Sequence, residues 1–484
     1  MSKKQNANYQ KHEISAFNNN PLIEAIRPAM DIKNFTKKIR VDLIVDQNVQ
    51  QMDDFDRELM VELLDTVYLP DPELYTLYRS VLKAIMVSYL HRNPINSDTD
   101  GIQHQIATDK NYRIPDSINL SCCISCVGLS GAGKTVAIEK CFSLLPSVIQ
   151  HNGYNGRYLN KQQIVRLKFE APATKTKKGF VLNFLAAVDE ALETPAGKGY
   201  YDEWKDDRSH ISVLIQEAKC IAFSHSIGIV FVDEIQRCVG DDDKVDAATL
   251  SFIDNFFNSI GIPMVVAGTY AVQPLFSTTM STARRLSSGR MFEFAGVQKT
   301  FIDQDDPLKI GPNPYFDMFV NAFYKPNLLR NTFNFDDDVK KALFYYSWGI
   351  QKLLIRLIKL CYEEAIRSGI EQITVQLIED VYFDQFKLLH TALSAIREGT
   401  SGGYKDLIKF EKWEKCAQQH LVDAVIDKCS KSNSSELPLV EDDGMTIYVP
   451  PAKATYIPKD DLRNLSGMGK DAYIERFLGK KNGL

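Results

Sequence analysis

The stretch Gly128-Leu-Ser-Gly-Ala-Gly-Lys134-Thr135 fits the pattern GxxxxGK[ST] and could hold the phosphates of a nucleoside triphosphate. In such a loop the glycines let backbone N–H groups converge on phosphate oxygens, and the helix that follows adds its positive N-terminal end. The lysine would reach the β- and γ-phosphates, and the threonine hydroxyl would hold Mg²⁺. The expected contacts to ATP are Gly128, Ser130, Gly131, Ala132, Gly133, Lys134, Thr135 and Val136.

The surroundings of this loop separate a phosphate site from a chance match in a glycine-rich turn. The apolar run SCCISCV precedes the loop and predicts a buried strand. The segment VAIEKCFSLL follows the loop and predicts a helix. A strand–loop–helix order is the context in which the pattern binds phosphate, so the phosphate interpretation is favoured.

A second motif, IGIVFVDEIQ (227–236), predicts a buried strand that delivers Asp233 to its carboxyl end. Ligands of open α/β sheets bind at that end of the strands. Asp233 would bind Mg²⁺, and Glu234 would orient and deprotonate an attacking water. An ordinary strand that ends in an acidic turn is the alternative. The Asp-Glu pair favours ATP hydrolysis coupled to assembly or movement, because kinases and small GTPases usually lack this glutamate.

Two further polar residues could sense the nucleotide. The predicted strand IPMVVAGT (262–269) ends in Thr269, which could contact the γ-phosphate, although a simple strand-to-loop turn is the alternative. In the helical part of the chain, Gly349-Ile-Gln-Lys352 predicts a helix start that could lean over the nucleotide. Lys352 would then contact phosphate, and a solvated lysine is equally consistent with the sequence.

The segment STARRLSSGR (281–290) contains Arg284, Arg285 and Arg290 and is short of acidic residues. An arginine presented to the nucleotide of a neighbouring subunit would stabilise charge in the transition state. Arg285 is the first candidate and Arg284 the second, whereas surface arginines without a role are the alternative. A metabolic P-loop kinase has no use for such an arginine, so the segment argues against that class.

Composition limits the class of protein without identifying it. The chain has 484 residues with 57 basic and 62 acidic side chains, which gives a net charge of −5. Overall charge therefore does not favour nucleic acid, and any DNA contact must come from a local patch. Nine cysteines in a chain of this length do not indicate a disulfide framework, so a reduced, cytoplasmic protein is expected. The sequence predicts neither a secretion signal nor a membrane-spanning segment.

The predicted elements indicate an α/β fold with a parallel sheet flanked by helices. Short apolar runs alternate with helical patterns between about residues 120 and 300, as in sheets covered on both faces. Apolar residues at helical spacing predict a helix over 70–94, followed by a polar loop at 93–101. The expected domains are an N-terminal arm for partner docking (1–69), an ATPase core (70–300), a small all-helical lid (301–400), and a helix with a flexible C-terminal tail (401–484).

Taken together, the motifs resemble an AAA+ P-loop ATPase, and within that class the longer TnsC-type members of the TnsC/TniB transposition regulators. The supporting stretches beyond the two nucleotide motifs are NPLIEAIRP, SYLHRNP, DEIQ, FFNSIGIPMVVAGT and ITVQLIEDVYFDQFKLLHTALSAI, and the resemblance covers roughly residues 17–400. Many ATPases share GKT and DEIQ, so the combination with NPLIEAI and DQFKLLH carries the distinction. Lys352 departs from the arginine that many AAA+ proteins have at this position.

The resemblance implies an ATP-dependent homo-oligomer, a ring or a helical filament, on double-stranded DNA. Such proteins link a target-selection protein to the transposase, and ATP hydrolysis with Mg²⁺ controls their assembly. The alternative is a replication-type AAA+ loader or initiator, which would share the core and a DNA surface. Initiators commonly append a winged-helix domain. Residues 401–484 are short and interrupted by prolines, which argues against such a domain here.

A local basic stretch offers a surface for DNA in this acidic chain. Residues 151–180 carry one acid, Glu170, among the basic residues Arg157, Lys161, Arg166, Lys168, Lys175, Lys177 and Lys178. Lysines and threonines suit phosphate contacts, which hold a duplex without reading its sequence. The segment ATKTKKG, at a position that resembles the DNA-facing element of this family, assigns Lys175, Thr176, Lys177 and Lys178 to DNA binding, with a solvated loop as the alternative.

Overall fold

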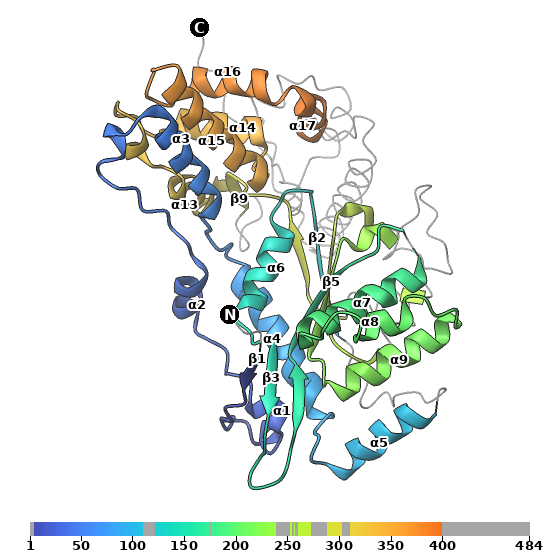
Figure 1. Cartoon of the computed structure of the whole chain (residues 1–484). Coiled ribbons are helices and arrows are strands. Elements are labelled where there is room, and N and C mark those ends of the chain that lie inside the picture. Colours follow the sequence, from blue (N-terminus) through green and yellow to red (C-terminus); the bar gives the residue numbers. More distant parts are fainter. Residues whose placement is uncertain are drawn as a thin grey trace, which may run out of the picture. The chain divides into compact units, whose positions relative to one another are not determined.

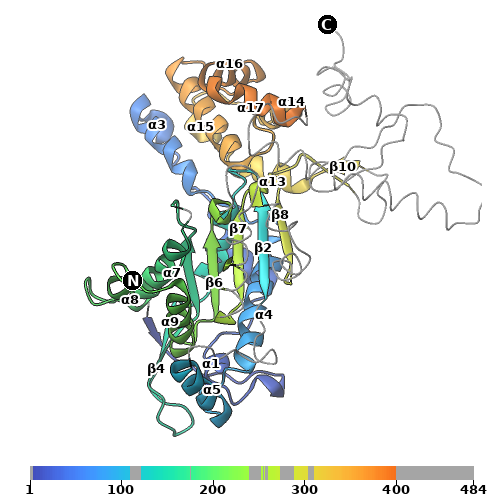
Figure 2. The same cartoon turned by 90° about the vertical axis from the view of Figure 1, so that its right-hand side faces the viewer.

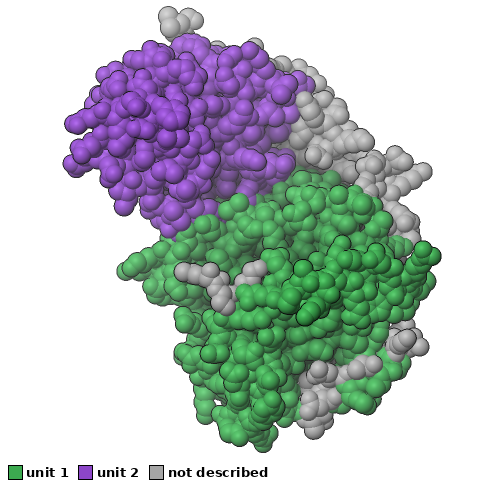
Figure 3. Space-filling view, viewed as in Figure 1, with its two compact units in different colours: residues 1–39, 70–128, 134–293 green, residues 40–69, 129–133, 294–484 purple. Residues whose placement is uncertain are grey.

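The computed structural model describes residues 4–109, 122–174, 176–238, 252–253, 256, 260–272, 288–302 and 310–398. The chain forms two compact units, which are coloured separately in Figure 3. Unit 1 comprises residues 1–39, 70–128 and 134–293, and unit 2 comprises residues 40–69, 129–133 and 294–484. Each unit is therefore assembled from segments that are separate in the sequence.

Unit 1 is built on a five-stranded sheet with the order β5-β6-β7-β2-β8 (Figure 2). Strands β2 and β7, β7 and β6, and β6 and β5 pair in parallel. Every residue of β2, β6 and β7 is buried, as expected for apolar strands covered on both faces. The strands run over Cys123–Gly128 (β2), Arg166–Glu170 (β5), Ile229–Asp233 (β6), Met264–Gly268 (β7) and Met291–Phe294 (β8).

Helices cover both faces of this sheet, which Figure 1 shows nearly edge-on with α4 and α6 on one side and α7 and α9 on the other. Helix α4 packs against α6, and α7 packs against α9. In α4 the buried residues Leu77, Val81 and Ile85 follow the predicted helical spacing. The helices run over Leu74–Leu90 (α4), Lys134–Ser143 (α6), Lys177–Leu192 (α7), Tyr200–Trp204 (α8) and Ile211–Ser224 (α9). The predicted α/β fold with a helix-flanked parallel sheet is confirmed.

Two segments of unit 1 differ from their predicted structure. The polar loop predicted at 93–101 runs into helix α5 (Ser97–Thr108), because Ile106 of that helix is buried against Phe223 of α9. The single strand predicted for QQIVRLKF is divided into β4 (Lys161–Ile164) and β5. The chain leaves one sheet for the other at Val165, whose backbone N–H donates to the Ser147 carbonyl at 2.9 Å.

The beginning of the chain is held by a second sheet with the order β1-β3-β4. Strand β1 (Lys4–Asn6) pairs in parallel with β3 (Val148–His151), which pairs antiparallel with β4. The Tyr9 hydroxyl lies 2.8 Å from Nδ1 of buried His151, and Nε2 of that ring lies 2.9 Å from Oε1 of Gln163. Residues 1–39, predicted as part of one arm, thus fall in unit 1, with short helices at Pro21–Glu24 (α1) and Ile32–Ile39 (α2).

Unit 2 is mainly helical in its described residues, and it also contains an antiparallel strand pair and the segment 40–69. Helix α15 packs against α3, α14 and α16. Trp348 and Gly349 both adopt positive φ angles of 53° and 65°, which ends α14 and lets α15 start in a new direction. The elements run over Asp54–Glu62 (α3), Thr300–Ile302 (β9), Ile310–Pro312 (β10), Pro314–Ala322 (α13), Asp337–Ser347 (α14), Gln351–Arg367 (α15), Val375–Gln385 (α16) and His390–Arg397 (α17).

A buried ion pair holds α3 to the rest of unit 2. The guanidinium of Arg57 donates to both carboxylate oxygens of Glu371 at 2.7 and 2.8 Å, and to the Leu328 carbonyl at 3.2 Å. The side chain of Arg57 is 0% exposed and that of Glu371 is 6% exposed. Burial alone would raise the pKa of Glu371, but the hydrogen bonds from Arg57 and Arg330 outweigh it and lower that pKa. The carboxylate therefore stays charged inside the unit.

Within the described part of the chain, no helix has the length and apolar character needed to cross a membrane. Residues 401–484, predicted as a helix with a flexible tail, lie outside the described residues.

We expect Arg57→Ala to lower the free energy of unfolding by about 3–5 kcal/mol, because it leaves the Glu371 carboxylate buried without its partner. Urea denaturation followed by circular dichroism measures this loss. The pKa of Glu371 is lower in the folded state than in the unfolded state. The ion pair therefore contributes fully to the free energy of unfolding above the unfolded-state pKa, and this contribution is lost as pH falls through the folded-state pKa. Arg40→Ala, which breaks the exposed pair with Asp42, is the matched control and should cost less than about 1 kcal/mol. Equal losses for both variants would contradict the assignment.

Candidate nucleotide-binding site

The lysine of the phosphate loop is already directed into the loop by the fold. Strand β2 ends at Gly128, and α6 begins at Lys134, as the strand–loop–helix pattern predicts. The Lys134 ammonium donates to the Gly128 carbonyl at 3.0 Å, and the side chain is only 9% exposed. A buried ammonium that is held across the loop needs little rearrangement to meet a phosphate oxygen. Val136, one residue further along α6 than Thr135, is 44% exposed.

The turn of the loop, residues 129–133, requires glycine at two positions. Gly131 and Gly133 have φ angles of +80° and +88°, in the region that side chains with a Cβ rarely adopt. A β-carbon at Gly133 would collide with Oε1 of Gln351, so the side chain of Gln351 approaches the loop closely. Ala132 in the same turn is buried, whereas Ser130 is exposed. Sequence reasoning missed Gln351, which only its contact with the loop reveals.

Lys352 approaches the phosphate loop through its backbone rather than through its ammonium group. Its N–H donates to the Gly131 carbonyl at 3.1 Å, and its side chain is exposed. The predicted helix start at Gly349-Ile-Gln-Lys352 is confirmed, since α15 begins at Gln351. The positive N-terminal end of α15 therefore lies beside the loop, while phosphate binding by the Lys352 ammonium remains a prediction.

A hydroxyl and a carboxylate meet where the second motif ends. The Thr135 hydroxyl on the first turn of α6 donates to Oδ2 of Asp233 at 2.9 Å. Asp233 is 5% exposed, and its Oδ1 accepts the backbone N–H of Glu234 at 2.9 Å. A hydroxyl oxygen beside one carboxylate fits Mg²⁺, which usually keeps waters and takes few protein ligands together with phosphate. Thr135 and Asp233 would hold the ion, and Mg²⁺ would neutralise charge on the phosphates.

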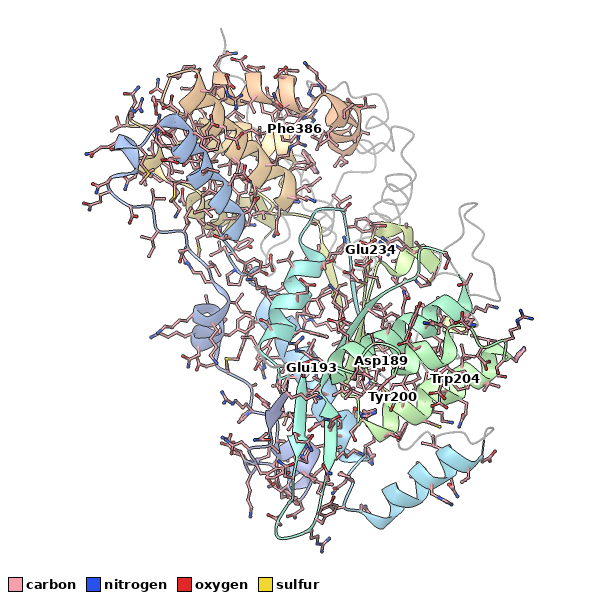
Figure 4. The ribbon with its side chains drawn as sticks, in the orientation of Figure 1. Asp189, Glu193, Tyr200, Trp204, Glu234 and Phe386 are labelled. Atoms are coloured by element: carbon pink, nitrogen blue, oxygen red, sulfur yellow. The ribbon has the colours of Figure 1, made fainter. Side chains whose placement is uncertain are left out.

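Glu234 lies at the end of the sheet, and its own backbone is strained (Figure 4). Its φ angle is +54°, which is uncommon for a residue with a Cβ. Its Oε2 accepts a hydrogen bond from Nε2 of Gln236, and Oε1 of Gln236 accepts the backbone N–H of Thr269 at 3.3 Å. Thr269 follows β7, which lies between β2 and β6. The predicted base and the predicted sensor are therefore linked through Gln236, which sequence reasoning did not single out.

The remaining predicted residues divide between described and undescribed parts of the chain. Arg284, Arg285 and Lys175 lie outside the described residues, so their roles stay predictions. Arg290 is described and precedes β8, where its guanidinium lies 5.6 Å from the ring centre of Phe292. Arg290 is exposed, and a role for it at a neighbouring nucleotide stays a prediction.

Around the start of α7 the basic residues are partly engaged by the protein itself. The Thr176 hydroxyl caps the helix by accepting the Gly179 N–H at 3.1 Å. The Lys178 ammonium donates to the carbonyls of Lys205 and Asp207 at 2.9 and 2.5 Å. Lys168 on β5 forms an ion pair with Glu139, and burial lowers the pKa of Arg166 on the same strand. Lys168 and Lys178 are therefore engaged within the chain, and DNA binding by the stretch 151–180 stays a prediction.

Comparison with known proteins agrees with this geometry. Residues 121–276, which include both nucleotide motifs and Thr269, match the family described as AAA domain. The fold is that of an AAA+ P-loop ATPase. The chain is an ATPase. Its helix-flanked parallel sheet brings the Thr135 hydroxyl to Asp233, while the roles of Lys134, Thr135 and Asp233 with ATP stay predictions. No curated protein matches the chain.

Several solved structures are similar to this chain at low identity. A Walker-type ATPase of Pyrococcus abyssi has 9% identity and a TM-score of 0.34, covering 68% of this chain and 85% of that one. Cdc6p of Pyrobaculum aerophilum has 12% identity and a TM-score of 0.32, covering 70% and 89%. AMPPCP-bound DnaA from Aquifex aeolicus has 13% identity and a TM-score of 0.28, covering 69% and 88%.

We expect Lys134→Ala to weaken ATP binding by about 10- to 100-fold, because it removes a charged hydrogen bond to phosphate worth about 1.5–3 kcal/mol. Titration with a fluorescent ATP analogue measures the change. Lys140→Ala, on the same helix but outside the loop, is the control and should bind like the parent protein. An unchanged affinity in Lys134→Ala would show that this loop does not bind the phosphates.

Proposed function

We propose that this AAA+ ATPase is a regulator of transposition that assembles on duplex DNA in its ATP-bound state. The contact between the Thr135 hydroxyl and the Asp233 carboxylate carries the nucleotide-dependent part of the proposal. It joins the phosphate loop to the strand that bears Glu234, so bound ATP–Mg²⁺ would contact both elements at once. Glu234 is the proposed general base that activates water.

Assembly between subunits is supported by the arginine segment 281–290 and by the resemblance to TnsC-type regulators. Arg285, with Arg284 as the second candidate, would reach the ATP of a neighbouring copy and stabilise charge in the transition state. The proposed assembly is a ring or a helical filament. Its proposed partners are a transposase and a target-selection protein. The free cysteines of the described residues support a reducing, cytoplasmic location.

The proposed DNA contact is the segment of Lys175, Thr176, Lys177 and Lys178 at the start of α7. The N-terminal end of a helix and adjacent lysines both attract phosphate. The engagement of Lys178 with two carbonyls leaves Lys177 as the most available described cation of this set. Contacts of this kind hold a duplex without reading its sequence.

Electron microscopy of the protein with duplex DNA and ATP tests the assembly. We expect rings or filaments that require both components. In Glu234→Gln, assemblies should persist in ATP, because hydrolysis falls by about 100-fold or more when the general base is lost. Phosphate release and negative-stain images together measure the two effects.

Several outcomes of this experiment would overturn parts of the proposal. Intact hydrolysis in Glu234→Gln would remove the assignment of the base. A protein that stays monomeric in the presence of ATP and DNA would contradict the proposed assembly. If the chain forms assemblies but loads a replicative helicase onto DNA instead of stimulating a transposase, the replication-type alternative holds.

We expect the triple change of Lys175, Lys177 and Lys178 to glutamine to weaken DNA binding and flatten its salt dependence. The slope of log K against log [salt] should fall by about 0.9 for each phosphate that the protein no longer neutralises. Fluorescence anisotropy at several salt concentrations measures this slope, and ATP affinity should not change. The matched control is the triple change of Lys33, Lys37 and Lys38, which are exposed on α2 and carry the same charge. Equal weakening by both variants would show a general charge effect and contradict a specific contact.

A further inference from the structure

The side-chain amide of Gln236 connects the two predicted catalytic elements of unit 1. Its Nε2 donates to Oε2 of Glu234 at the end of β6. Its Oε1 accepts the backbone N–H of Thr269, which follows β7, at 3.3 Å. Both ends of one amide are thus used, so rotation of the amide would break two hydrogen bonds at once.

The backbone around Gln236 keeps this amide in place. The 3-10 helix η4 (Ile235–Cys238) is anchored by the buried side chains of Ile235 and Cys238, and it packs against β7. A β-carbon at Gly268, the last residue of β7, would lie 2.8 Å from Oε1 of Gln236 and 3.0 Å from Cγ2 of Ile235. Glycine at 268 therefore leaves the space that the Gln236 side chain occupies.

The conformation of Glu234 indicates that its position is held by its neighbours. A left-handed φ of +54° is unfavourable for a residue with a Cβ, and such a conformation persists where the surroundings determine it. Its N–H donates to Asp233, its carboxylate accepts from Gln236, and its backbone carbonyl accepts the Arg237 N–H at 2.9 Å.

We propose that Gln236 is a positioning residue for ATP hydrolysis, which fixes the Glu234 carboxylate relative to the end of β7. This inference rests on the proposed role of Glu234 as general base. With the amide donating to Oε2, Oε1 would accept the proton of the attacking water. The water oxygen forms a bond to the γ-phosphorus, the bond between that phosphorus and the β–γ bridging oxygen breaks, and ADP leaves. A carboxylate that is fixed in one orientation is more often in position to accept a proton from this water.

The experiment compares steady-state ATP hydrolysis in Gln236→Ala and the parent protein. We expect kcat to fall about 10- to 100-fold with KM for ATP within about twofold, because the base is misplaced while the phosphate loop is intact. Gln216→Ala is the matched control, since Gln216 donates to the Ile106 carbonyl on the other helices of unit 1 and should leave kcat unchanged. Thermal melting of both variants tests for general loss of folding.

Glu234→Gln measured alongside separates the failure of this inference from the failure of the proposed base. If Glu234→Gln abolishes hydrolysis and Gln236→Ala has the kcat of the parent protein, only the positioning role is overturned. If Glu234→Gln hydrolyses ATP normally, the assignment of Glu234 as the general base is wrong. A rise in KM equal to the fall in kcat would place Gln236 in nucleotide binding and would also overturn the inference.

Discussion

The arrangement of the site depends on the parallel pairing of β2, β7 and β6 in adjacent positions. Parallel strands end at the same edge of a sheet, so the phosphate loop, Thr269 and Asp233 are delivered to one edge. The contact of Thr135 with Asp233 and the amide bridge through Gln236 both become possible only in this order. These two contacts are therefore a consequence of the strand order.

The packing of unit 2 depends on a different constraint, which is a buried ion pair. Arg57 and Glu371 are separated by most of the chain, yet their side chains are almost fully buried together. A buried pair of this kind adds little stability over an apolar pair, but losing one partner is costly. The pair therefore commits the segment 40–69 to the helices of unit 2.

Much of the fold could be predicted because the buried strands are continuously apolar. The runs that became β2, β6 and β7, and the helical spacing of α4, were read correctly from the sequence. The predictions were wrong where tertiary contacts outweigh the local pattern. Residues 97–101 are helical because α5 packs against α9, and Val165 marks a change of sheet that apolar spacing cannot show.

By itself, the sequence determined which residue types make up the candidate nucleotide site, since the GxxxxGK[ST] pattern and the Asp-Glu pair are each read from adjacent residues. Only the tertiary structure decided which side chains meet. Gln236 lies two residues after Glu234, but its contact with Thr269 requires β6 and β7 to be neighbours. Gln351 reaches Gly133 across more than two hundred residues of sequence. Such contacts depend on strand order and helix packing, which no local pattern of residues encodes.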